Sequence, residues 1–435
     1  MDEHHRPSRH GSTWRRFGPA IGPVAAFSCV LIASAYAGAA QTGDGAGAPS
    51  QARLASYETK YYIIHSDLDI DTVREAAARL TAMAEEYHQR TKDFSGTIRA
   101  KLPFYLFSRP QDYLAAGGPL GSWGAYKSGG KSDMLMAFIP KEMGGGVWEV
   151  VQHEGFHQFA DKVITGRLPI WVNEGLATYF GHGIWTGDGL VAGIVDPGRY
   201  QRVQAMIKAD KVMPFAEMLS MSDQQWQSPI RMSNYDQAWS MVHFLVHADD
   251  GKYRGAFSGF IADLAARKQW KPAFAARFGR DVESFQNRYG QWWLALPENS
   301  DQELRTRATV ATLTSFLGRA RGEGQKYQTV EEFFDAARAG KLKMNPSNWL
   351  PQSLLNRALD EAAKLKDWSI DNGRSLPQLK LALKEGPLTF VGSFTLNREG
   401  VDQVSVATER PTPPAEGVKA GTKPPTTSRR AEESR

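Results

Sequence analysis

Apolar and polar positions repeat with two different periods in the first part of the chain, and this pattern predicts strands and helices in turn. Runs of strand length, in which apolar residues stand close together, occupy residues 61–65, 101–107 and 134–139. Residues 69–90 repeat their apolar positions every three or four residues, which is typical of an amphipathic helix, and residues 110–116 predict a shorter helix. This part of the chain therefore predicts a small sheet whose strands alternate with helices.

The glycine-rich residues 117–130 (GGPLGSWGAYKSGG) lie between the second and third predicted strands. They lack the spacing of a phosphate-binding loop, so we interpret them as a surface loop. From residue 147 to residue 293 the pattern becomes mostly helical. A small N-terminal sheet followed by helices predicts the α+β fold class.

The candidate chemistry lies in residues 147–180, which contain His153-Glu154-Gly155-Phe156-His157. Residues four apart lie on one face of a helix, so His153 and His157 can hold one metal ion from the same side. Glu154 can then reach a water bound to that ion. A catalytic zinc takes three protein ligands and keeps a fourth position for water. Glu174, on a second predicted helix, can supply the third ligand.

The alternative interpretation of this motif is a solvated helix whose histidines only pack or cap. The phrase around Glu174, WVNEGLATYF, argues against it, because it would form an apolar helix that buries the carboxylate. An unpaired buried carboxylate is costly. A metal ion removes that cost, so the sequence favours a zinc site.

At these residues the chain resembles the gluzincin metallopeptidases, in particular their peptidase MA-like members. The resemblance rests on His153, Glu154, His157 and Glu174 with the surrounding WVNEGLA, and it covers about residues 57–293. It implies a zincin-like fold, one Zn²⁺ per chain, and hydrolysis of peptide bonds by a zinc-activated water with Glu154 as the general base. Sixteen residues separate His157 from Glu174, slightly fewer than in the best-known gluzincins, which implies a short connection between the helices.

The resemblance also implies a substrate-binding strand. In the family, the strand before the metal-binding helix forms the edge of the sheet and binds extended substrate as an added strand. Here that strand is residues 134–139, and Met136, Ala137 and Phe138 are the implied substrate-binding residues. An internal strand without a ligand role is the alternative.

Tyr235, in the segment NYDQAWSMVHFL, resembles the tyrosine that stabilises the oxyanion in gluzincins. A phenol can donate a hydrogen bond to a developing oxyanion at neutral pH. A tyrosine that only packs at the start of a helix is the alternative. The catalytic residues implied by the resemblance are thus Glu154 and Tyr235.

The free-amine-binding signature of the aminopeptidase branch, Gly-x-Met-Glu-Asn, is absent from the sequence. The resemblance therefore implies an endopeptidase, which acts on a peptide or protein substrate. The alternative function is a catalytically inactive zincin-scaffold protein of the cell envelope that binds peptides or partner proteins. A zinc hydrolase of non-peptide amides also stays open.

The remaining histidines carry no assigned chemistry. His243 and His247 are four residues apart, but no glutamate follows His243 and the residues between them are apolar. We interpret both as core or partly exposed histidines. His65 and His182 stay unassigned.

After residue 297 the composition changes and no catalytic constellation follows. Residues 301–321 and 329–338 predict charged amphipathic helices, residues 350–366 a further helix, and residues 388–396 with 401–406 a late hairpin. This region, 298–409, can be a small second domain or can pack against the peptidase domain at 56–297. Residues 410–435 have the composition of a disordered tail.

The N-terminal segment, residues 1–40, predicts a signal peptide, because four arginines precede an apolar run and small residues offer a cleavage site. An uncleaved anchor is the alternative. Residues 41–55 predict a flexible linker. The only cysteine, Cys29, lies in the signal segment, so the exported chain is expected to form no disulfide.

The formal net charge of +5 is mild for 435 residues and gives no reason to expect nucleic-acid binding. Outside the N-terminal segment, no apolar run reaches the roughly 18 residues of a membrane span. We therefore expect an exported protein without a permanent membrane span once the signal peptide is cleaved. The sequence does not indicate an oligomeric state.

Overall fold

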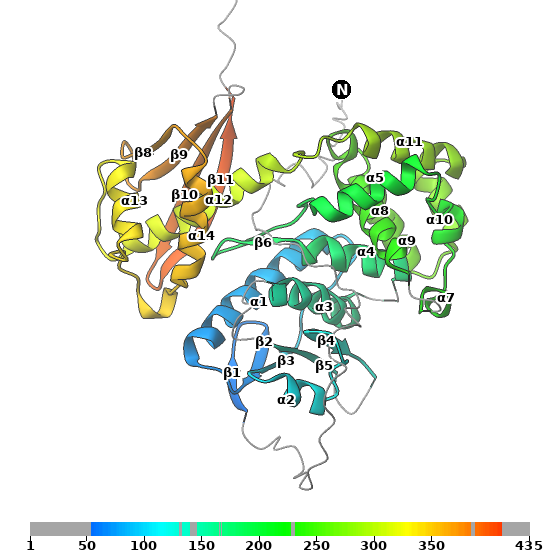
Figure 1. Ribbon diagram of the computed structural model, residues 1–435, viewed down its shortest axis with the longest axis horizontal. Helices are drawn as coiled ribbons and strands as arrows, with labels where there is room; N and C mark the ends of the chain where they lie inside the picture. Colours follow the sequence, from blue (N-terminus) through cyan, green and yellow to red (C-terminus); the bar gives the residue numbers. More distant parts are fainter. Residues whose placement is uncertain are drawn as a thin grey trace, which may run out of the picture.

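A computed structural model describes residues 54–129, 133–139, 146–164, 166, 168–227, 231–383 and 388–410. It is an α+β protein in which a small mixed sheet, a helical region and a second sheet follow one another along the chain (Figure 1). The predicted signal peptide, all but the last two residues of the predicted linker, and nearly all of the predicted tail lie outside the described residues. Among the described residues, no helix combines the length and the apolar character that a membrane span requires.

The N-terminal sheet has the strand order β1-β2-β3-β5-β4. Strands β2, β3 and β5 are parallel, and the outer strands β1 and β4 run antiparallel to their neighbours. All three predicted strands are confirmed, whereas β1 and β4 were not predicted, and β1 begins inside the predicted linker. The bounds are β1 Ala55–Glu58, β2 Tyr62–Ser66, β3 Leu102–Phe107, β4 Gly124–Lys127 and β5 Met134–Phe138.

Strand β4 corrects two predictions. Residues 117–130 are not only a loop, because they contain β4, and β4 rather than β5 is the edge of the sheet. The amide of Phe138 donates to the carbonyl of Trp123 on the β4 side, and the amide of Ile139 donates to Phe107 on the β3 side. The prediction failed because it followed chain order, whereas the chain folds back as a hairpin and inserts β5 between β3 and β4.

The substrate-binding assignment of Met136, Ala137 and Phe138 is therefore wrong in its premise. These residues pair with β3 on one side and lie next to β4 on the other. Met136 and Ala137 are fully buried. A strand paired on both sides has no free backbone edge to which an extended peptide can be added.

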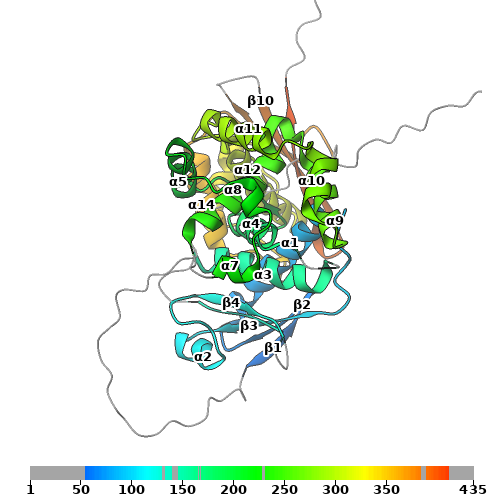
Figure 2. The ribbon, with the colours of Figure 1, turned by 90° about the vertical axis from the view of Figure 1, so that its right-hand side faces the viewer.

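Two helices cover one face of the N-terminal sheet and a short helix lies on the other (Figure 2). Helix α1, Ile70–Thr91, confirms the helix predicted over residues 69–90, and it begins where the Asp69 carboxylate accepts a hydrogen bond from the amide of Thr72. Helix α3 lies beside α1, and α2, Pro110–Ala115, contacts β3 and β5. Alternate residues of β2 and β3 are buried, so the sheet directs its apolar face toward α1 and α3.

The middle of the chain is helical, as predicted, with one small hairpin that the sequence did not indicate. Helix α4 packs between α3 and α8. At Gly175 a Cβ atom would lie 2.6 Å from the carbonyl oxygen of Ala238, so the close approach of α4 and α8 requires glycine there. The bounds are α3 Gly146–Val163, α4 Ile170–Gly181, β6 Ile184–Trp185, β7 Leu190–Val191, α5 Pro197–Lys208, α6 Phe215–Met218, α7 Asp223–Gln227, α8 Met232–Gly251, α9 Arg254–Ala265, α10 Trp270–Phe278 and α11 Val282–Ala295.

Residues 302–409 form a C-terminal module with its own antiparallel sheet, in the order β11-β10-β9-β8. The predicted hairpin is confirmed as β10 and β11, and the predicted helices as α12, α13 and α14, whereas β8 and β9 were missed. The bounds are α12 Gln302–Gly322, α13 Val330–Arg338, a 3₁₀ turn Pro346–Asn348, α14 Gln352–Ala363, β8 Trp368–Asp371, β9 Gln378–Leu383, β10 Leu388–Asn397 and β11 Gly400–Glu409.

Helix α12 is a buried helix and not the charged amphipathic helix that the sequence predicted. Every residue from 306 to 320 is buried. Several of its polar side chains find partners within the protein: Thr314 donates to the carbonyl of Val310, and Nη1 of Arg307 donates to the carbonyl of Val406, whereas Nε of Arg307 has no partner among the described residues. Polar side chains that have partners can be buried, so the polar residues of this segment wrongly predicted an exposed face.

The C-terminal module packs against the rest of the chain and shares its main apolar core. The β6–β7 hairpin, residues 184–191, reaches toward the module (Figure 1). Ile184, Val191 and Ile194 share an apolar cluster with α12, β9, β10 and β11. At the hairpin tip, the carboxylate of Asp188 accepts a hydrogen bond of 2.8 Å from each terminal nitrogen of Arg319. Of the two alternatives that the sequence left open, packing against the rest of the chain is therefore the one observed.

Candidate metal centre

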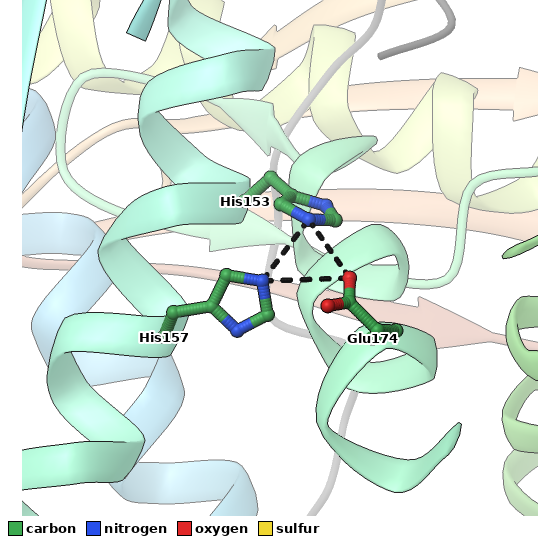
Figure 3. A group of neighbouring side chains, drawn as sticks. All are labelled: His153, His157 and Glu174. Carbon is green, nitrogen blue, oxygen red and sulfur yellow. Dashed lines mark hydrogen bonds and ion pairs between the residues drawn. The ribbon is translucent and has the colours of Figure 1, made fainter. Parts of the chain in front are cut away.

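The three predicted metal ligands come together between α3 and α4 (Figure 3). The Nε2 atoms of His153 and His157 are 3.2 Å apart. The Oε2 atom of Glu174 lies 3.4 Å from Nε2 of His153 and 3.5 Å from Nε2 of His157. The side chains are only 10%, 14% and 13% exposed, so the three donor atoms form a nearly regular, largely buried triangle.

The size of this triangle fits zinc. Zinc binds histidine nitrogen and carboxylate oxygen at about 2.0–2.1 Å in a tetrahedron, whose edges are then roughly 3.3–3.4 Å. The three donor-to-donor distances lie on either side of that value. Two histidines and one carboxylate also match the donor set of catalytic zinc sites that keep one position open. The residues present therefore fit the ion.

Local sequence explains how α3 presents its two histidines. Positions 153 and 157 lie one turn apart, and the adjoining side of the helix carries Phe156 and Phe159, which pack around Tyr87 of α1. The hydroxyl of Tyr87 donates to the carbonyl of Gln152 at 2.5 Å. The apolar side thus holds α3 on α1 and directs the histidines away from the core.

Gln152 links α3 to the end of α4. Its Nε2 atom donates to the carbonyls of Phe180, Gly181 and Gly183, at 3.2, 2.8 and 3.1 Å. Phe180 and Gly181 end α4 and Gly183 follows it, so Gln152 binds the C-terminal end of that helix, where carbonyls lack partners within the helix. Since Gln152 directly precedes His153, this contact fixes the two metal-binding helices relative to one another.

The charges in the triangle favour a bound cation. Burial alone would raise the pKa of Glu174, but the two histidines outweigh burial and hold that pKa well below its usual range. Burial lowers the pKa of His157, and the opposing charge of Glu174 outweighs it and raises that pKa to about 9. In the metal-free chain a proton on histidine thus supplies the positive charge that the buried carboxylate requires.

Two polar atoms next to the triangle lack hydrogen bonds. Nδ1 of His157 and Oδ1 of Asn173 are buried and have no partner of standard geometry among the described residues. Asn173 nevertheless contributes to raising the pKa of His157. An acceptor near Nδ1 favours the tautomer that leaves Nε2 free for a metal. Asn173 was not among the predicted site residues, and its position directly before Glu174 is the signal in the sequence that could have indicated it.

Glu154 lies outside the triangle, as expected of a residue that is not a ligand. Its Oε2 atom accepts a hydrogen bond of 2.9 Å from the backbone amide of Tyr126 on β4. The hydroxyl of Tyr126 also contacts α3, since it donates a hydrogen bond of 2.7 Å to Asp161. The edge strand and the predicted general base are thus in direct contact.

Strand β4 is the part of the site that sequence analysis missed. Its Gly124 packs on α3, because a Cβ there would lie 3.0 Å from Val150. Along a strand, the backbone N–H and C=O groups of successive residues point alternately to the two sides of the strand. Since Trp123 bonds toward β5, the amides of Gly124 and Tyr126 face the open edge. The glycines that follow at 129 and 130 are typical of a hairpin turn and are the signal that could have revealed the strand.

Tyr235 lies in the first turn of α8, on the face that α4 contacts. Ala238 and Val242 are three and seven residues further along the same face, and both approach Gly175, the neighbour of Glu174. The ring of Tyr235 packs edge-on against Trp226 at 5.0 Å. Tyr235 thus starts the helix face that packs on α4, its ring contacts α7, and its part in catalysis stays a prediction.

The other histidines have structural surroundings. Nε2 of His243 lies 3.3 Å from the carbonyl of Gly193, and Nε2 of His247 lies 3.1 Å from the hydroxyl of Tyr179. Burial lowers the pKa of His243 to about 4 and lowers that of His247 well below its usual range, so both are neutral. Within the described part of the chain, His153, His157 and Glu174 are the only such group close enough to hold a metal. His243 is buried and His247 is partly exposed, so the interpretation of the two as core or partly exposed histidines is confirmed.

Comparison with known proteins finds a partial match to a family whose activity is unknown. Residues 148–269 match the model of a family described as "Protein of unknown function (DUF1570)". The match includes both metal-binding helices and the helix of Tyr235, but it spans little more than a quarter of the chain and omits β4. No curated protein sequence matches the chain.

Proposed function

We propose that the protein is a zinc-dependent metallopeptidase of the gluzincin type, with a zincin-like fold, that hydrolyses peptide bonds. One observation carries the proposal: the triangle of His153, His157 and Glu174 has edges of 3.2–3.5 Å and lies beside a glutamate that is not a ligand. A metal site that only stabilised the fold would be closed by a fourth protein ligand. Here the residue next to the ligands is instead a carboxylate suited to proton transfer.

The ligands and the base have separate tasks. The two imidazoles and the Glu174 carboxylate would hold Zn²⁺, which supplies Lewis acidity and makes water acidic enough to react near neutral pH. Glu154 accepts the proton that water loses as it adds to the peptide carbonyl. Glu154 then delivers that proton to the nitrogen of the leaving amine as the C–N bond breaks.

The correction of the sheet edge moves the proposed substrate strand from β5 to β4. An extended peptide added to β4 would pair with the outward-facing backbone of Gly124 and with the carbonyl of Tyr126. The amide of Tyr126 already bonds Glu154, so the substrate would lie directly beside the base. In this proposal Tyr235 donates to the developing oxyanion from α8.

The proposal extends to specificity and location. The chain lacks the free-amine-binding signature of aminopeptidases, so we assign it as an endopeptidase. The arginine-led apolar segment at its N-terminus supports export after cleavage of a signal peptide. Its partners are then peptide or protein substrates outside the cytoplasm.

The proposal is tested by metal analysis together with cleavage of a broad peptide library. We expect about one zinc per chain, internal cleavage of peptides, and loss of cleavage on addition of a chelator that added zinc reverses. A protein that holds zinc and binds peptides without cleaving any would instead be the inactive scaffold. A protein that holds no zinc would overturn the assignment altogether.

A further inference from the structure

A chain of buried polar residues begins directly behind the metal centre. Glu149 lies one turn before His153 on the same face of α3, and His182 lies two turns after Glu174 at the end of α4. Oε2 of Glu149 is 3.8 Å from Nδ1 of His182. Both residues are buried, at 7% and 6% exposure. The two metal-binding helices therefore share a second polar contact next to the metal triangle.

His182 connects this contact to α5. Nε of Arg199 donates to Nε2 of His182 at 3.0 Å. An atom that accepts a hydrogen bond carries no proton, so the ring proton of His182 is on Nδ1, facing Glu149. Burial, with the charge of Arg199 added to it, lowers the pKa of His182 well below its usual range, which keeps the ring neutral.

The chain ends on Asp236, the residue after Tyr235. Nη1 of Arg199 donates to Oδ1 of Asp236 at 2.6 Å, and Nε of Arg202 donates to Oδ2 at 2.6 Å. Asp236 is only 1% exposed. Two arginines from one turn of α5 thus hold a single carboxylate in the first turn of α8.

The first turn of α8 has no side-chain cap of its own. Its N-cap residue, Arg231, makes no side-chain capping bond, so the start of the helix lacks the usual local anchor. Helix α5, in contrast, is anchored, because the Asp196 carboxylate accepts from the amide of Arg199 at 2.7 Å. A well-fixed α5 therefore holds the uncapped start of α8.

We propose that Glu149, His182, Arg199 and Asp236 form a positioning network that sets Tyr235 relative to the metal-binding helices. The proposal rests on the proposed function, in which Tyr235 acts on the substrate. Replacing a buried ion pair by apolar residues is often neutral or stabilising, so stability alone gives weak reason for such a network. A role in orienting the helical turn that carries Tyr235 would explain why these charged groups are buried.

The network predicts a particular kinetic change. Asp236→Asn keeps the shape of the side chain and removes its charge. We expect kcat to fall about 10- to 100-fold, the range measured for residues that orient catalytic groups, with KM within about threefold and zinc content unchanged. Asp236→Glu, which restores the charge, should recover part of kcat.

A double variant separates positioning from general damage. If Asp236 acts through Tyr235, then Asp236→Asn should cost little further kcat in a chain that already carries Tyr235→Phe. The matched control is Asp263→Asn on α9, where another buried carboxylate is held by Lys268 at 2.7 Å and Arg277 at 3.0 Å. That variant should lose stability and keep kcat.

Amide hydrogen exchange tests the network without any activity. Asp236→Asn should accelerate exchange in the first two turns of α8, and Asp263→Asn should leave them unchanged. Unchanged exchange in Asp236→Asn, or kcat losses from Tyr235→Phe and Asp236→Asn that simply multiply, would overturn the positioning role. A wild-type protein without zinc or cleavage would overturn the proposed function, while the exchange result would still decide whether Asp236 holds α8.

Discussion

Two carboxylates only fourteen residues apart in the chain are buried to a similar degree but have different kinds of partner. Glu174, with a side chain 13% exposed, faces two imidazole nitrogens at 3.4 and 3.5 Å. Asp188, 18% exposed, faces the guanidinium of Arg319 and the hydroxyl of Ser315. The negative charge of Asp188 is balanced by protein partners alone. Glu174 lies among groups that are neutral unless protonated, so it has room for a cation that the chain does not supply.

This difference gives a rule for finding sites in a protein of unknown activity. A buried carboxylate paired with arginine stabilises one arrangement of the chain and needs nothing more. A buried carboxylate that converges with histidines is satisfied only by a proton or a metal. The two ends of the segment from α4 to the β6–β7 hairpin thus have different tasks, and variants should separate them.

The largest expected effect is loss of the metal. His157→Ala leaves two ligands, which do not close a zinc site, so zinc should fall from about one per chain to near zero and cleavage to background. Metal analysis of the purified variant measures this. His65→Ala, a histidine stacked on Tyr105 in the sheet, is the control and should keep its zinc. Full zinc content in His157→Ala would contradict the assignment of the triangle.

The next effect separates chemistry from binding. Glu154→Gln keeps the shape and the ligands but cannot accept a proton, so cleavage should fall about 10²- to 10⁴-fold with zinc content unchanged. Asp161→Asn is the matched control, since this carboxylate lies two turns along α3 and bonds the side chain of the same Tyr126. Wild-type cleavage by Glu154→Gln would refute the general-base role.

A third prediction concerns the complete ion pair. Arg319→Met leaves Asp188 without its cation, and the free energy of unfolding should fall by about 3 kcal/mol, the low end for a buried pair because Asp188 keeps some exposure. Denaturant unfolding measures this, and zinc content should not change. Adding Asp188→Asn to the same chain should recover part of the loss. Loss of zinc from the single variant would show that the comparison is wrong.

The smallest expected effect lies next to the metal centre. Asn173→Ala removes the acceptor near Nδ1 of His157, and zinc affinity should fall about 10- to 100-fold, as for other residues that orient a metal-binding histidine. Competition with a chelator of known affinity measures the change. Asn173→Asp keeps an acceptor and should stay close to wild type. Equal losses in both variants would rule out an orienting role for Asn173.

The sequence alone predicts the parts of the site whose contacts are local. The spacing of His153 and His157 is a helical spacing, and the apolar phrase around Glu174 indicated a second buried helix, so the triangle could be predicted without a structure. Prediction failed where the arrangement depends on distant contacts. Strand β4 is four residues long, and only its pairing with β5 shows which strand is at the edge.

The same limit explains the C-terminal module. The late hairpin has a local turn signal and was predicted, whereas β8 and β9 gave none that we recognised. Helix α12 looked exposed because it is rich in arginine and threonine, and its burial became clear only when the partners of Arg307 and Arg319 were known. Tyr235 lies between these cases: its helix was predicted, but its direction depends on the packing of α8 against α4.

The docked β6–β7 hairpin also bears on proteolysis and truncation. The link at residues 297–300 is exposed, so a protease can cut there. Yet Ile184, Val191 and Ile194 are buried by the C-terminal module, and a chain that ended at residue 297 would expose them to water. Cleavage at the link should therefore give two fragments that stay associated, whereas a chain shortened at the same point should aggregate. The boundary visible along the chain is not a boundary of independent folding.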